Sequence, residues 1–132
     1  PWWLVGITVF SGILVLTLAE WIDSEALTVR AAAAHGALVV ASSDMSHYLP
    51  ARVAREKDHR AIERILALDP AGLYEVVHRE RISMCGIVPA TVMLVAAREL
   101  GAREVELVRY SNSAEASGDE SSVVGYAGAV VR

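Results

Sequence analysis

Two short motifs carry the side chains of this sequence that could do chemistry together. Asp44 and His47 lie three residues apart in "SSDMSHYLP", directly after an apolar run at residues 37–41. Cys85 is the only cysteine, and it precedes a predicted helix in "SMCGIVP". Neutral imidazole and thiolate are good ligands for iron, copper or zinc, and a nearby carboxylate can orient the imidazole or handle protons. These residue types make His47 and Cys85 candidate metal ligands, and Asp44 and His47 candidate catalytic groups.

Each candidate also has a purely structural interpretation. An aspartate three residues before a histidine, after a strand, is common as an Asx-turn or a helix cap. A cysteine between Met84 and Ile87 is often a small core residue, because free cysteine is among the most buried residue types. The other histidines lie on predicted helices or helix ends among charged neighbours, where a solvated position is typical; they are His35, His59 and His78.

The apolar periodicity switches repeatedly between that of strands and that of helices. Strands are predicted at residues 3–8, 37–41, 105–110 and 123–131, and helices at 11–22, 24–34, 52–68, from Pro70, and 88–100. The run at 37–41 does not alternate, which is typical of a central strand buried on both faces. The pattern predicts an α/β fold with a mostly parallel or mixed central sheet flanked by helices. Ligands of such sheets collect beyond the carboxyl ends of strands, so we expect His47 and Cys85 to lie close together at one edge.

Composition limits the classes of function. A chain of 132 residues, 54% of them hydrophobic, is long enough for one compact domain. The net charge of −4 provides no basic surface for phosphates, so nucleic acid is not expected as a partner. A single cysteine excludes an intrachain disulfide and suits a reducing, cytoplasmic setting.

The first 19 residues carry no charge, and their length approaches that of a membrane span. Gly6 and Gly12 interrupt the run, and residues 3–8 are rich in β-formers. We therefore predict a buried strand and helix in preference to a membrane segment. The start at Pro1, without a methionine, suggests a fragment.

Read together, the motifs resemble a known family. The segments "SSDMSHYLP", "DHRAIERILALDPAGLY", "ISMCGIVPATVML", "LGA", "YSNS" and "SGDESSVVGYA" follow one another as in the C-terminal half of the Memo family, the middle partner of the AmmeMemoRadiSam group. The resemblance covers roughly residues 37 to 130. It implies a fold similar to class III non-haem iron dioxygenases of the extradiol type, and one partial domain over residues 1–132 whose N-terminal half is absent.

The resemblance also implies roles for individual residues. Cys85 falls on the family's metal-binding cysteine, His47 on its pocket histidine and Asp44 on the acid beside it. The family's other metal-binding histidines belong to the N-terminal half, which has no counterpart here. The metal implied for the full-length protein is iron or copper. With only Cys85 and His47 in matching positions, this chain is expected to bind metal weakly and to show no turnover.

Two functions remain open. One is a metal-dependent redox enzyme that activates dioxygen or another oxidant. The other is a non-catalytic binding module that receives phosphopeptides or other partner proteins in the same cleft. The resemblance further implies an unknown small molecule or peptide as ligand and a functional link to a radical SAM protein of the same system.

Overall fold

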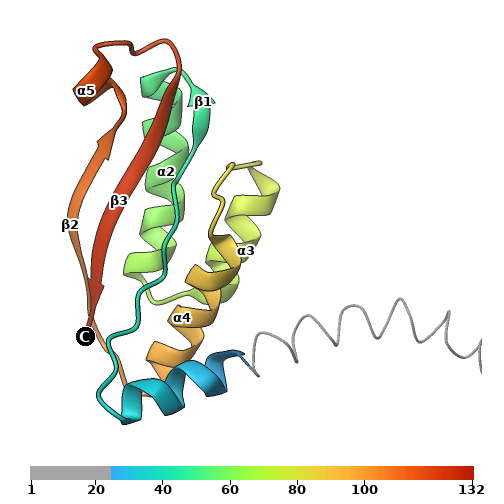
Figure 1. The fold of residues 1–132 in the computed structure, drawn as a ribbon. Coiled ribbons are helices and arrows are strands. Elements are labelled where there is room, and N and C mark those ends of the chain that lie inside the picture. The colour runs from blue at the N-terminus through green and yellow to red at the C-terminus, as the bar shows by residue number, and fades with distance from the viewer. Residues whose placement is uncertain (1–24) are drawn as a thin grey trace, which may run out of the picture.

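A computed structural model describes residues 25–132 of the chain (Figure 1). The strand at 3–8, the helix at 11–22 and the question of a membrane segment at 1–19 lie outside these residues. In the described part, no helix combines the length and apolar character that crossing a membrane would require.

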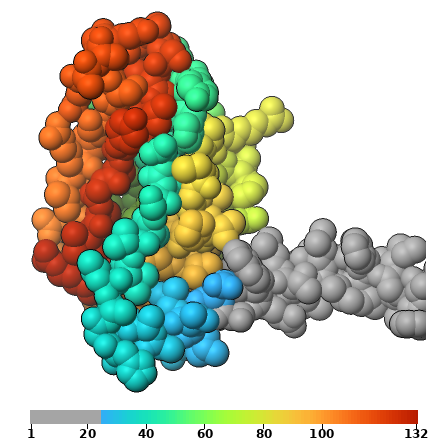
Figure 2. Space-filling view, viewed as in Figure 1, coloured from blue at the N-terminus to red at the C-terminus, as the bar shows by residue number. Residues whose placement is uncertain are grey.

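The prediction of a mostly parallel or mixed central sheet is wrong. The strands β1 (His47–Leu49), β2 (Val105–Asn112) and β3 (Val123–Val131) form one antiparallel sheet in the order β1-β3-β2. The segment 37–41 is not a strand, and Leu38 and Val40 are 90% and 75% exposed. A continuous apolar run becomes a central strand only if strands pair with both of its edges, and no such pairs form within residues 25–132. Figure 2 shows this segment running over the surface beside β3.

The helices after β1 largely agree with prediction, because their boundary residues have clear roles. Helix α2 (Ala51–Leu66) is followed by α3 (Pro70–Arg79), whose first turn is capped by the Asp69 carboxylate, which accepts a hydrogen bond from the amide of Gly72 at 2.9 Å. Helix α4 (Ile87–Glu99) ends just before Gly101, which adopts the left-handed φ of 93°. The polar segment between β2 and β3 contains the short helix α5 (Ala114–Ser117).

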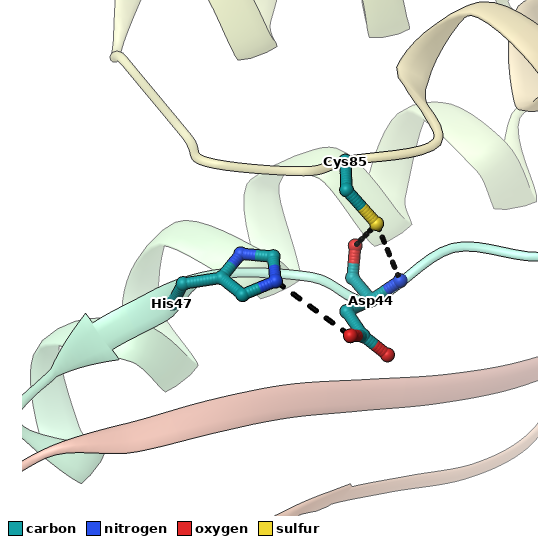
Figure 3. Close-up of side chains that lie close together, drawn as sticks. All are labelled: Asp44, His47 and Cys85. Carbon is teal, nitrogen blue, oxygen red and sulfur yellow. Dashed lines mark hydrogen bonds and ion pairs between the residues drawn. The ribbon is translucent and has the colours of Figure 1, made fainter.

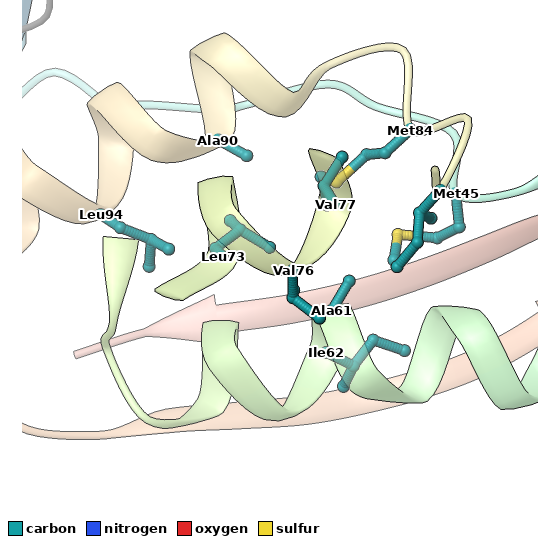
Figure 4. Close-up of a cluster of buried hydrophobic side chains, with 10 residues drawn as sticks. Met45, Ala61, Ile62, Leu73, Val76, Val77, Met84, Ala90 and Leu94 are labelled. Carbon is teal, nitrogen blue, oxygen red and sulfur yellow. The ribbon is translucent and has the colours of Figure 1, made fainter. Parts of the chain in front are cut away.

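The core lies between the helices and the sheet. Helix α2 packs against β2 and β3 on one side and against α3 on the other, and α3 packs against α4. The buried cluster shown in Figure 4 joins these helices to Met45 in the segment before β1. Its members are Met45, Ala61, Ile62, Leu73, Val76, Val77, Ile82, Met84, Ala90 and Leu94. Met45 and Met84 each stand next to a predicted site residue, so core packing anchors both halves of the site.

Candidate functional site

The structure brings together the three residues that the motifs indicated. Asp44 lies in the segment before β1, and His47 is the first residue of β1. Cys85 comes from the turn between α3 and α4. One ligand atom from each of these side chains lies within 4.8 Å of the other two (Figure 3). The predicted proximity of His47 and Cys85, far apart in sequence, is confirmed.

Cys85 is held against the Asp44 segment by hydrogen bonds across the two loops. The amide of Asp44 donates to Cys85 Sγ at 3.2 Å. Ser43 Oγ accepts from the amide of Gly86 at 2.9 Å and donates to the carbonyl of Asp44 at 2.7 Å. A Cβ atom on Gly86 would lie 2.5 Å from the carbonyl oxygen of Ser42, so only glycine permits this close crossing.

His47 is oriented by Ser83, two residues before Cys85. The His47 amide donates to Ser83 Oγ at 2.7 Å, and ring atom Nδ1 lies 2.6 Å from the Ser83 carbonyl oxygen. Because a carbonyl oxygen can only accept, Nδ1 must carry a proton and donate. The neutral ring therefore has its lone pair on Nε2, which lies 3.6 Å from Asp44 Oδ2. This arrangement, with Nδ1–H on a backbone carbonyl and the lone pair on Nε2, is typical of metal-binding histidines.

The donor atoms fit a transition metal in kind and approximately in spacing. Around one ion, with bonds of about 2.0–2.3 Å, ligand atoms lie about 3–4 Å apart. The separation of 3.6 Å between His47 Nε2 and Asp44 Oδ2 is in this range, and the 4.8 Å limit for the whole group leaves about 1 Å to close by side-chain rotation. The imidazole is partly buried, the Asp44 side chain is half exposed, and Cys85 is exposed. An ion can therefore approach from solvent.

The remaining histidines lie outside this group within residues 25–132. His35 and His78 are exposed, and the His78 ring donates to the carbonyl of Tyr74 at 2.8 Å. His59 is half-buried, and its ring packs against the Tyr110 ring in a T-shaped arrangement with a centroid distance of 4.8 Å.

Sequence reasoning missed Asp58, a fully buried acid on α2 that lies behind the site. Its Oδ1 accepts from the amide of Ser46 at 2.9 Å, and its Oδ2 accepts from the hydroxyl of Tyr110 at 2.8 Å. Burial, followed by the hydrogen bond to Asp58 and the charge of that carboxylate, raises the pKa of Tyr110 well above its usual value. A signal was available: Asp58 lies four residues after Ala54 and four before Ile62, on the buried face of the helix.

Comparison with known proteins supports the resemblance of the motifs. Residues 20–130 match the family described as "Memo-like protein". A MEMO1 family protein of Methanosarcina barkeri is 52% identical over 92 residues, which are 70% of this chain and 35% of that protein. One from Methanopyrus kandleri is 50% identical over 95 residues, covering 72% of this chain and 34% of the relative. The chain thus spans about a third of the length of the curated relatives it matches.

Proposed function

The chain belongs to the family of Memo-like proteins, and from this membership and the site geometry we propose that Asp44, His47 and Cys85 bind a redox-active transition metal, iron or copper. One observation carries the proposal. His47 Nε2 carries the lone pair of the neutral ring, and it lies with a carboxylate oxygen of Asp44 and the Cys85 sulfur in a group whose atoms are within 4.8 Å of one another. A metal cation between these three atoms would bind a lone pair from each of them.

Each residue has a role that its contacts support. Cys85 supplies a sulfur ligand, and the amide of Asp44 that donates to it stabilises negative charge on that sulfur. His47 supplies a nitrogen ligand whose orientation is fixed by Ser83. Asp44 is a third donor, and its half-exposed carboxylate is also the group that would transfer protons to or from a molecule bound beside His47. A mixed set of nitrogen, oxygen and sulfur donors suits iron, copper or zinc better than magnesium or calcium.

Three protein donors leave open positions on an ion that takes four to six ligands, so a small molecule can bind beside them. A bound iron or copper ion supplies one-electron chemistry with dioxygen or another oxidant. The redox activity of a whole Memo-like protein is part of the proposal. For the 132-residue chain we expect reversible, weak metal binding without turnover, because the group is open to solvent.

The alternative, a module that receives phosphorylated peptides at this cleft, is less favoured. The amides of Asp44 and Gly86 already donate to Cys85 and Ser43, so neither is free for an anion. The Asp44 carboxylate would also repel a phosphate group.

Anaerobic titration of the purified chain with iron(II) and copper(I) tests the proposal. We expect one ion per chain and an affinity at least about tenfold lower in Cys85→Ser and in His47→Ala. His78→Ala is the matched control, because this exposed histidine on α3 lies outside the group. An unchanged affinity in both site variants, or an equal loss in the control, would overturn the assignment.

A further inference from the structure

Asp44 and His47 flank a dipeptide, Met45-Ser46, whose backbone is held from two sides. On one side, the Met45 amide donates to the Gly125 carbonyl at 2.9 Å, and the Gly125 amide donates to the Ser46 carbonyl at 2.8 Å. These bonds attach the dipeptide to β3. On the other side there is no strand within the described residues, because β3 lies between β1 and β2 in the sheet.

The Ser46 amide on that second side points to α2, where the Asp58 carboxylate accepts it at 2.9 Å. A helix side chain thus takes the place of a neighbouring strand as the acceptor. Both residues are 0% exposed, so water does not compete for this bond. The Asp58 carboxylate is itself fixed by the Tyr110 hydroxyl, which donates to its other oxygen at 2.8 Å.

The packing around Asp58 allows it little freedom. A Cβ atom built on Gly125 would lie 2.0 Å from Asp58 Oδ2, so the carboxylate lies directly against the backbone of β3. The Asp58 carboxylate is therefore in close contact with the backbone of both Gly125 and Ser46. A shift of any one of these residues would displace the other two.

We propose that Asp58 is a positioning residue that sets the relative placement of Asp44 and His47 by holding the Ser46 amide. Asp58 lies outside the group of three donor residues and acts through the backbone between them. The expected effect of Asp58 on metal affinity rests on the metal site proposed above. Displacement of Ser46 would move Asp44 Oδ2 and His47 Nε2 apart from their separation of 3.6 Å, and a misplaced donor weakens binding strongly.

The test compares Asp58→Ala with the conservative variant Asp58→Asn. The asparagine oxygen can still accept from Ser46, and its amino group can donate to the Tyr110 oxygen. We expect Asp58→Ala to lower the affinity for iron(II) at least about tenfold and Asp58→Asn to stay within about threefold of the original chain. Cobalt(II) loaded in place of iron should show an altered visible absorption spectrum in Asp58→Ala only.

Asp69→Ala is the matched control. It removes a helix-capping carboxylate, with some loss of stability, but it lies at the start of α3 outside the donor group. We expect its metal affinity and cobalt spectrum to be unchanged. An affinity loss in Asp69→Ala equal to that in Asp58→Ala would show that the lower affinity reflects a general loss of stability. That result would overturn the proposal.

Hydrogen exchange measured without metal separates this inference from the proposed function. In Asp58→Ala the amides of Ser46 and His47 should exchange at least about tenfold faster relative to core amides of α4, and in Asp58→Asn they should not. Unchanged exchange at these amides refutes the positioning role, whether or not metal binds. If these amides exchange faster in Asp58→Ala but the unmutated chain binds no metal, the proposed metal site is refuted and the positioning role of Asp58 is not.

Should Asp58→Ala fail to fold, Tyr110→Phe decides the matter. It frees one oxygen of Asp58 but keeps the ring and the acid. Faster exchange at Ser46 and a two- to fivefold loss of iron(II) affinity, on the order of one weakened hydrogen bond, support the proposal. Unchanged values for both quantities refute it.

Discussion

Replacing Gly125 by alanine should disrupt the contact between the Asp58 carboxylate and β3, which lies behind the candidate site. The new Cβ would lie 2.0 Å from Asp58 Oδ2, whereas ordinary contact needs at least 3.4 Å, so the carboxylate must retreat by about 1.4 Å. Its hydrogen bonds of 2.9 and 2.8 Å to Ser46 and Tyr110 cannot both survive that shift. Hydrogen bonds to a charged group contribute about 1.5–3 kcal/mol each, so the loss of one of them is expected to lower the free energy of unfolding of Gly125→Ala by about 1.5–3 kcal/mol.

Equilibrium unfolding in urea measures this loss, and Gly128→Ala on the same strand is its control. A Cβ on Gly128 meets nothing within 4 Å. Alanine is also intrinsically better than glycine in a strand, by about 0.5–1 kcal/mol, so the control should be neutral or slightly stabilising. A loss below about 1 kcal/mol in Gly125→Ala, or equal losses in the two variants, would refute the view that Asp58 is tightly held.

Three further changes test the loop crossing at Gly86, the buried Tyr110 contact and the buried Ser46 hydroxyl. In Gly86→Ala the Cβ would meet the backbone oxygen of Ser42 at 2.5 Å, so the two loops should separate and iron(II) affinity should fall at least about tenfold; an unchanged affinity would contradict the loop crossing. The raised pKa of Tyr110 means that the folded state resists ionisation, so its contribution to stability is fully present below the ordinary value of 10.0 and declines as the pH rises above it. Urea unfolding between about pH 8 and 11 should show a steeper decline in the original chain than in Tyr110→Phe, and parallel declines would count against the buried contact. The Ser46 hydroxyl is buried without a hydrogen-bond partner among residues 25–132. Ser46→Ala should therefore leave the free energy of unfolding unchanged or raise it by up to about 1 kcal/mol. A loss of more than about 1 kcal/mol would show that the hydroxyl makes a stabilising hydrogen bond.

The sequence predicted local features well because they depend on neighbouring residues. The helix predicted from Pro70 agrees with the start of α3, and the helix predicted at 88–100 agrees with α4 to within one residue at each end. His47 and Cys85 were expected to lie together because the first follows a predicted strand and the second precedes a predicted helix, at one edge of the predicted sheet. Their proximity is observed, while their roles as ligands or catalytic groups remain proposals.

The misjudged features depend on contacts between distant segments. The apolar run at 37–41 has the composition of a buried strand, but strand formation requires a partner, and none pairs with it within residues 25–132. The antiparallel sheet arises from pairing between β2 and β3, whose direction single-strand composition does not determine. Asp58 was overlooked because its importance lies in contacts with Ser46 and Tyr110, which are distant in sequence.

Anomalous X-ray scattering would show directly whether Asp44, His47 and Cys85 bind a metal ion. Crystals of the 132-residue chain would be soaked anaerobically in excess iron(II) and measured on both sides of the iron absorption edge. We expect one anomalous peak about 2.0–2.3 Å from both His47 Nε2 and Cys85 Sγ, on the side that faces Asp44 Oδ2. A peak only at other side chains, or none between these three atoms at saturating iron, would contradict it.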